Sequence, residues 1–93
     1  MKAIWNGEII AESNDTIEIE KNHYFPPDSI NKSYFNDSAT TSKCHWKGEA
    51  HYFNLKVKGE VNKDAAWYYP SPKKEVENIK NYLAFWHDVK FEE

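Results

Sequence analysis

A two-residue turn between short apolar segments constrains the fold of this chain more than any other feature. In KAIWNGEIIAES, Asn6 and Gly7 suit the two central positions of a type I′ turn, where both residues need a positive φ. We therefore predict an antiparallel hairpin with strands near residues 2–5 and 8–13. Residues 16–20 (TIEIE) then alternate between apolar and acidic side chains, which predicts a half-buried third strand.

The same signals return in the second half of the chain. Residues 49–57 alternate, and one face of the predicted strand carries His51, Phe53, Leu55 and Val57. A turn at Lys58-Gly59 predicts a second hairpin, in which residues 60–69 form the return strand. We therefore expect an antiparallel sheet in this half as well.

Between these regions, residues 22–41 (NHYFPPDSINKSYFNDSATT) show no sustained apolar period. Pro26 and Pro27 cannot donate hydrogen bonds to a strand ladder, so a preceding strand has to end there. The segment is predicted to be a long ordered loop, held to the domain by its own aromatic side chains. Long loops are uncommon in small domains and are often functional, so this loop is a candidate wall of a ligand site.

One helix is predicted near the end of the chain. Ser71 is suited to cap a helix, and Pro72 to occupy its first position, where the missing amide hydrogen costs nothing. The helix is predicted over residues 72–83, and its buried stripe has the i, i+3, i+7 spacing of Val76, Ile79 and Leu83.

These elements predict a single domain over residues 1–93 of the mainly β (small α+β) class. It would be a compact antiparallel β domain with one C-terminal helix, and the alternating tail, residues 84–91, would add a last strand. A chain of this length buries only about 60–65% of the surface that its unfolded form exposes, so it needs a dense core. Four Trp, six Tyr and five Phe provide large rings for that core.

Charge and composition narrow the possible functions. The net charge is −3, and all twelve basic residues are Lys, so no guanidinium group is available to bind phosphate or a guanine edge in a bidentate manner. We therefore expect no nucleic-acid partner. A single cysteine excludes an intrachain disulfide, and no apolar run has the length of a signal peptide or a membrane span. A cytoplasmic protein without membrane attachment, a monomer or weak homodimer, is the expectation.

Metal and nucleotide cofactors are not expected. Structural zinc usually takes about four Cys or His ligands, two of them close in sequence, and this chain has no such pair. A site assembled in space from the single cysteine and the histidines remains an alternative, but partly buried or surface histidines are the simpler interpretation. Gly7, Gly48 and Gly59 are isolated, so no phosphate-binding glycine-rich loop can form.

Cys44 is the candidate nucleophile or redox thiol of an enzyme hypothesis. Such a thiol needs a nearby cation to stabilise the thiolate, and His51 or Lys47 would supply it. Asp64 is a further catalytic candidate, because a strand carboxylate facing a cavity could act as an acid or base. The structural alternative is a Cys44 that packs as a small apolar side chain.

Four motifs are similar to a known family, the domain of unknown function 427 (DUF427). They are EKNHYFP (20–26), CHWKGEA (44–50) followed by Tyr52, the segment from Asn62 to AWYY (66–69), and Ala84-Phe85. The resemblance covers nearly the whole chain. It implies a compact, mainly β domain, β-tent-like, with a helix near the C-terminus.

The resemblance implies little about activity. The family also carries a nucleotidyltransferase-like label, but the Gly-Ser and paired aspartates expected of such enzymes are absent. Where the family pattern resembles Cys-Pro-Trp-Lys-Gly, this chain has His45, so position 45 is not expected to be a shared catalytic residue. Zinc-bearing β-tent proteins carry Cys-x-x-Cys pairs, and their absence here implies a fold without metal.

The preferred hypothesis is a small molecule bound between the sheet and the 22–41 loop. The motifs combine aromatic rings with a few polar groups, as ligand pockets do. The proposed ligand-binding residues are Asn22, Tyr24, Trp46, Lys47, Asn62, Trp67 and Tyr69. Trp46 and Trp67 would form walls, and Lys47 would anchor a charge. A protein-interaction module with an exposed aromatic patch is the third alternative.

Overall fold

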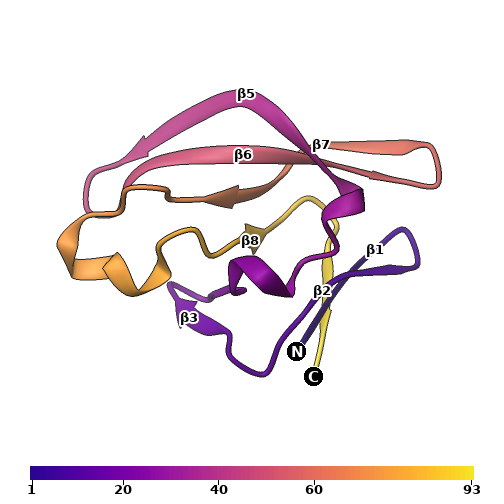
Figure 1. Cartoon of the computed structure of the whole chain (residues 1–93), viewed down its shortest axis with the longest axis horizontal. Coiled ribbons are helices and arrows are strands. Elements are labelled where there is room, and N and C mark those ends of the chain that lie inside the picture. Colours follow the sequence, from indigo (N-terminus) through magenta and orange to yellow (C-terminus); the bar gives the residue numbers. More distant parts are fainter.

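The Asn6-Gly7 hairpin forms as predicted in the computed structural model, which describes residues 1–93. Both turn residues have positive φ, 50° at Asn6 and 80° at Gly7. They join β1 (Lys2–Trp5) to β2 (Glu8–Glu12). A short C-terminal strand, β9 (Lys90–Glu92), pairs with the other edge of β1, so the chain termini lie side by side (Figure 1).

The main sheet has the strand order β5-β6-β7-β8. Its strands are β5 (Phe35–Cys44), β6 (Gly48–Val57), β7 (Glu60–Tyr68) and β8 (Ala84–Phe85). The predicted hairpin at Lys58-Gly59 is confirmed, because these residues have φ of 53° and 80° and join β6 to β7. In Figure 1, β5 arches away from β6 in the middle of the strand, where the pairing register of the two strands shifts.

A third, two-stranded sheet consists of β3 (Ile17–Ile19) and β4 (Asn22–Tyr24). Its turn residues, Glu20 and Lys21, both have left-handed φ, at 53° and 68°. Immediately after β4, Phe25 exchanges two backbone hydrogen bonds of 2.8 Å with Leu83. This bridge fixes the small sheet beside the entry to β8.

The prediction of a continuous loop over residues 22–41 was wrong. Its first three residues form β4, short 3-10 turns follow at Pro27–Ser29 and Lys32–Tyr34, and β5 begins at Phe35. The polar sequence of β5 is compatible with a strand because β5 is an edge strand of the main sheet and most of its side chains are exposed. An apolar period is therefore absent although the backbone is extended.

The predicted helix over residues 72–83 is shorter and of a different type. The structure has a 3-10 helix, Lys74–Ile79, with a kink at Val76, where φ is −129°. Its apolar residues are placed as the periodicity indicated, since Val76 and Ile79 are buried. No helix in the structure is long and apolar enough to cross a membrane. The predicted class, a mainly β antiparallel domain, is confirmed.

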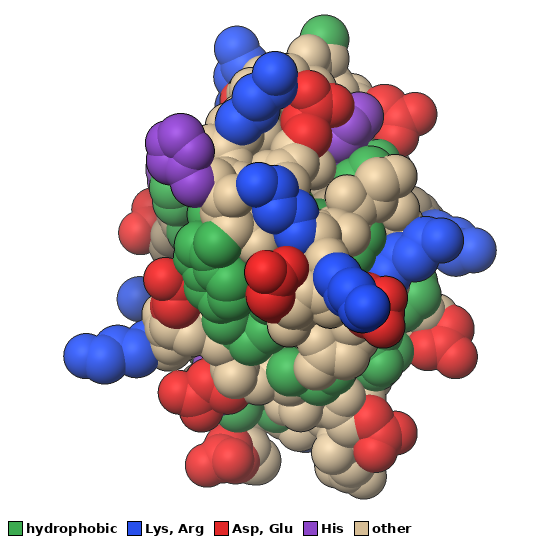
Figure 2. All heavy atoms as spheres, turned by 90° about the vertical axis from the view of Figure 1, so that its left-hand side faces the viewer, with side chains coloured by type: hydrophobic (Ala, Val, Ile, Leu, Met, Phe, Trp, Pro, Cys, Tyr) green, Lys and Arg blue, Asp and Glu red, His purple; other side chains and the backbone are tan.

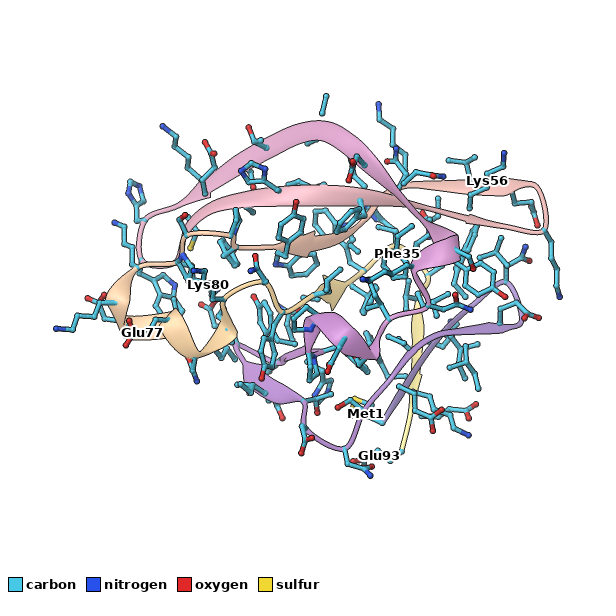
Figure 3. The ribbon with its side chains drawn as sticks, in the orientation of Figure 1. Met1, Phe35, Lys56, Glu77, Lys80 and Glu93 are labelled. Atoms are coloured by element: carbon cyan, nitrogen blue, oxygen red, sulfur yellow. The ribbon has the colours of Figure 1, made fainter.

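The core consists of two apolar clusters. The larger includes Ile10, Phe25, Leu55 and Phe85, and the smaller includes Tyr24, Tyr69, Val76 and Ile79. In β6, Phe53 packs against the larger cluster and its neighbour Tyr52 against the smaller, as strand alternation requires. Figure 3 shows side chains filling the space between the main sheet and the segments below it.

Candidate functional site

A small cavity lies between β4 and the side of the main sheet that packs on the smaller core cluster. Its volume is about 160 Å³, and its lining residues are Asn22, Tyr24, Lys47, Tyr52, Trp67, Tyr69 and Trp86. We call it the aromatic pocket. Five of these residues belong to the ligand-binding set proposed from the sequence, namely Asn22, Tyr24, Lys47, Trp67 and Tyr69. The 22–41 segment contributes to it through strand β4 and not through a loop.

The ring walls come from the β6–β7 pair and from the segment after β8. Tyr52 stands directly opposite Trp67 in the antiparallel register. Trp86 packs against both rings, with centroids 5.3 Å from Trp67 at 66° and 6.4 Å from Tyr52 at 28°. Its indole Nε1 donates to the Asp64 carbonyl over 2.6 Å, which fixes the ring orientation. A planar ligand would therefore meet rings of fixed position.

Lys47 is the only charged residue among the buried residues of the chain. It lies in the turn between β5 and β6, its side chain is 7% exposed, and its ammonium forms an ion pair with Glu20. The Lys47 carbonyl accepts a hydrogen bond of 2.9 Å from the Lys73 amide. The ammonium is thus held at the pocket by contacts at both ends of the residue.

Gly48 makes this arrangement of the turn possible. Its φ is +117°, a conformation that side-chain-bearing residues rarely adopt. A Cβ at this position would stand 3.2 Å from the Ser71 carbonyl oxygen. The backbone therefore approaches closely at Gly48, which brings the segment after β7 against the turn that carries Lys47.

The tyrosine hydroxyls of the pocket have different environments. The Tyr52 hydroxyl is hydrogen-bonded to Ser42 Oγ over 2.8 Å. Tyr24 is fully buried, and no hydrogen-bond partner of ordinary geometry reaches its hydroxyl oxygen. Burial raises the pKa of Tyr24 and, more strongly, that of Tyr69. Both groups are therefore neutral hydroxyls at pH 7, able to donate a hydrogen bond.

Trp46 and Asn62, both proposed as ligand-binding residues, lie outside the pocket. Residues 45–47 form the turn between β5 and β6, and Trp46 in this turn is 41% exposed. Its ring lies 4.6 Å from Lys47 Nζ and packs against the lysine from outside. Asn62 donates its amide to the His87 carbonyl over 2.7 Å and so supports the turn after β8.

The three catalytic candidates do not converge. Cys44 is at the end of β5 and lines a separate polar cavity of about 330 Å³. His51 lies on the other face of β6, where its ring is 5.8 Å from that of Tyr68 and its Nε2 is 3.1 Å from Glu49 Oε1. No group of three or more His, Cys, Asp or Glu side chains is placed to hold a metal ion. Cys44 is therefore not paired with His51 or Asp64.

The contacts of Asp64 connect strands of the main sheet. Asp64 is an irregular position in β7, with a φ of 55°, and its amide donates to Asn54 Oδ1 over 2.8 Å. Its carboxylate accepts hydrogen bonds from Ser38 Oγ at 2.5 Å and Thr40 Oγ1 at 2.9 Å, both from β5. The Ser38 hydroxyl, with help from that of Thr40, lowers the pKa of Asp64. The carboxylate thus joins two bulged strands across β6.

Tyr52 and Trp86 line the pocket although neither was predicted as a ligand-binding residue. Tyr52 had a signal, because alternation places it on the face opposite Phe53. Trp86 follows the two residues of β8, and the chain turns there with left-handed φ at His87 and Asp88. No periodicity could place it, since its position depends on that turn.

Charges of both signs are mixed on one face of the molecule. Figure 2 shows the side of the molecule that is on the left in Figure 1, where Lys side chains are interspersed with Asp and Glu and an apolar patch lies between them. This face therefore carries no continuous basic surface.

Comparison with known protein families gives one match. The family model for the Domain of unknown function (DUF427) matches residues 1–93. A comparison with curated proteins gave no match to this chain.

Proposed function

The chain belongs to the DUF427 family, and we propose that it binds a small, uncharged or weakly charged molecule with one planar ring in the aromatic pocket. The observation that carries this proposal is the convergence of Tyr52, Trp67 and Trp86 on one cavity that also contains a buried lysine. Pockets that bind small molecules combine such apolar walls with a few placed polar groups. Here the polar groups are the Lys47 ammonium, the Asn22 amide and the tyrosine hydroxyls.

The size of the cavity limits the ligand. A cavity of roughly 150 Å³ is known to accommodate benzene, whereas drug-sized ligands occupy about 300–1,000 Å³. At about 160 Å³, the aromatic pocket has room for one ring with a short substituent. Contacts with the two indoles would contribute about 0.5–1.5 kcal/mol per ring pair beyond the burial of apolar surface.

Titration with a library of single-ring fragments, followed by amide and indole chemical shifts, tests the proposal. We expect the shifted resonances to cluster at Trp67, Trp86 and the residues beside them. Shifts scattered over the surface, or none at all, would contradict the proposal.

Two tryptophans of similar exposure provide a matched pair of variants. Trp86 is 45% exposed and lines the pocket, whereas Trp46 is 41% exposed and lies outside it. Trp86→Leu should weaken fragment binding about tenfold or more, because about 1.4 kcal/mol of ring contact corresponds to one factor of ten. Trp46→Leu should leave the affinity within about threefold. Equal losses in both variants would show that the fragments bind to exposed indoles in general.

A further inference from the structure

We propose that the natural ligand carries a single anionic oxygen group on its ring, as an aromatic carboxylate does, and that it takes the place of Glu20 at Lys47. This inference rests on the proposed function of the aromatic pocket and specifies the ligand class. It follows from the charges, the donors and the exposure of the groups that line the pocket.

The lining residues are matched to an acceptor on the ligand. They include one cation, Lys47, and no carboxylate. Two of the phenolic hydroxyls, those of Tyr24 and Tyr69, are neutral donors, and the hydroxyl of Tyr24 has no partner although the residue is fully buried. A buried donor without an acceptor is costly, and a ligand oxygen that reached it, which requires the side chains around this closed hydroxyl to shift, would remove that cost. The pocket therefore favours a ligand with an acceptor.

The ion pair at Lys47 is asymmetric. The Lys47 side chain is 7% exposed, whereas the Glu20 side chain is 54% exposed. An ammonium has three donors, and Glu20 is the only side chain that accepts a hydrogen bond from them, since the Trp46 ring contacts the ammonium only through its face. Glu20 can return to water at little cost, but Lys47 cannot do so without leaving the protein interior. A ligand carboxylate can therefore replace Glu20 and keep the buried charge compensated.

The absence of arginine also limits how many oxygens of a ligand carboxylate the protein can bind. Lysine acts as a point charge, while bidentate recognition of a carboxylate relies on the planar fork of arginine, which this chain lacks. Lys47 would thus hold one oxygen, and the orientation of the ring would come from Trp67 and Trp86. This division of roles suits a planar ring with one short charged substituent.

Three single-ring probes of similar size and two variants test the inference. Benzoate, benzamide and benzyl alcohol are titrated against wild-type protein, Glu20→Gln and Lys47→Met at pH 7, where benzoate is ionised. In the wild type, benzoate should bind at least about fivefold more tightly than benzamide. Glu20→Gln should tighten benzoate binding severalfold and change benzamide binding less than about twofold, because the competing carboxylate is removed. Lys47→Met should remove the preference for benzoate.

Glu18→Gln is the control for net charge. Glu18 is an exposed residue of β3, two positions from Glu20, and makes no ion pair. It should leave all three affinities unchanged. If Lys47→Met does not fold, the contrast between Glu20→Gln and Glu18→Gln still decides the question.

The outcomes separate the two proposals. If benzamide or benzyl alcohol binds as tightly as benzoate, or if Glu20→Gln weakens benzoate binding, the carboxylate inference is overturned while the pocket remains a ring-binding site. If no probe shifts a resonance of the pocket, the proposed function fails, and the inference fails with it.

Discussion

Replacing Tyr24 by Phe should stabilise the protein, because the hydroxyl that is lost has no partner. Tyr24 is fully buried and has no hydrogen bond of ordinary geometry; the Trp67 indole can only donate to its oxygen, so the O–H donor of Tyr24 has no acceptor. An unsatisfied buried polar group costs about 1–3 kcal/mol. The void left by one oxygen, about 10 Å³, costs only about 0.2 kcal/mol at 24 cal/mol per Å³. The free energy of unfolding should therefore rise by about 1–3 kcal/mol.

Thermal unfolding measures this effect directly. For a domain of about this size, 1 kcal/mol shifts Tm by roughly 4–8 °C, so Tyr24→Phe should unfold at a temperature several degrees higher. Tyr34→Phe is the matched control, because the Tyr34 hydroxyl donates to Glu8 Oε1 over 3.0 Å, and its removal should lower Tm. A Tm of Tyr24→Phe at or below that of the wild type, with the expected loss in Tyr34→Phe, would refute the reasoning. The Tyr24 hydroxyl would then have a partner, such as a bound water.

The same substitution relates stability to binding. If the unpartnered Tyr24 hydroxyl is kept for a ligand, Tyr24→Phe should bind benzoate more weakly while being more stable. Such opposition between stability and function is common where an active or binding site contains groups that the fold alone does not satisfy. A variant that is more stable and binds equally well would separate the hydroxyl from the pocket's role.

Three further substitutions test other parts of the structure. Gly48→Ala should lower the free energy of unfolding in urea by about 2–3 kcal/mol, because it combines a strained φ of +117° with a Cβ 3.2 Å from the Ser71 carbonyl oxygen; an unchanged urea midpoint would contradict this. Lys21→Gly should raise the stability by about 0.5–1 kcal/mol, because its φ of 68° is unfavourable for lysine, and a lower Tm would show that the Lys21 side chain makes a compensating contact. The pKa of Asp64 is lowered from its ordinary value of 3.8, so its contribution to stability is present above that value and is lost as the pH falls through the lower folded pKa. Asn tolerates the left-handed backbone at this position, so Asp64→Asn tests the carboxylate alone. In this variant the free energy of unfolding should fall less steeply with decreasing pH below about pH 4. A fall as steep as in the wild type would exclude this carboxylate as its origin.

Turns with glycine were predictable from the sequence, and turns without it were not. Asn6-Gly7 and Lys58-Gly59 have the residues that a two-residue hairpin needs, and both form. The turn at Glu20-Lys21 has the same left-handed geometry in two residues with ordinary side chains. The pairing of β3 with β4 and the burial of Tyr24 in the core hold this turn in place, and local propensity describes neither.

The pairing register of β6 and β7 was also not predictable from the local sequence pattern. Counting back from the Lys58-Gly59 turn places Ala65 opposite Tyr52, whereas the structure places Trp67 there. The difference of two residues arises between Phe53 and Leu55 on β6, beside the irregular position Asp64 on β7. Alternation therefore predicted the two faces of β6, but the irregularity in β7 places the neighbours Ala65 and Ala66 in one core cluster and decides which residues meet across the strands.

The charged end and the ring walls of the aromatic pocket have separate structural origins. The walls follow largely from one strand pair and the turn after β8, whereas the Lys47 ammonium depends on contacts from distant segments. Gly48 permits the close approach to the segment after β7, the Lys73 amide holds the Lys47 carbonyl, and Glu20 reaches the ammonium from a left-handed turn. Changes to these contacts should therefore alter the preference for a charged over a neutral ligand. Truncation of the rings should weaken the binding of both ligands, because both present the same ring to the indoles.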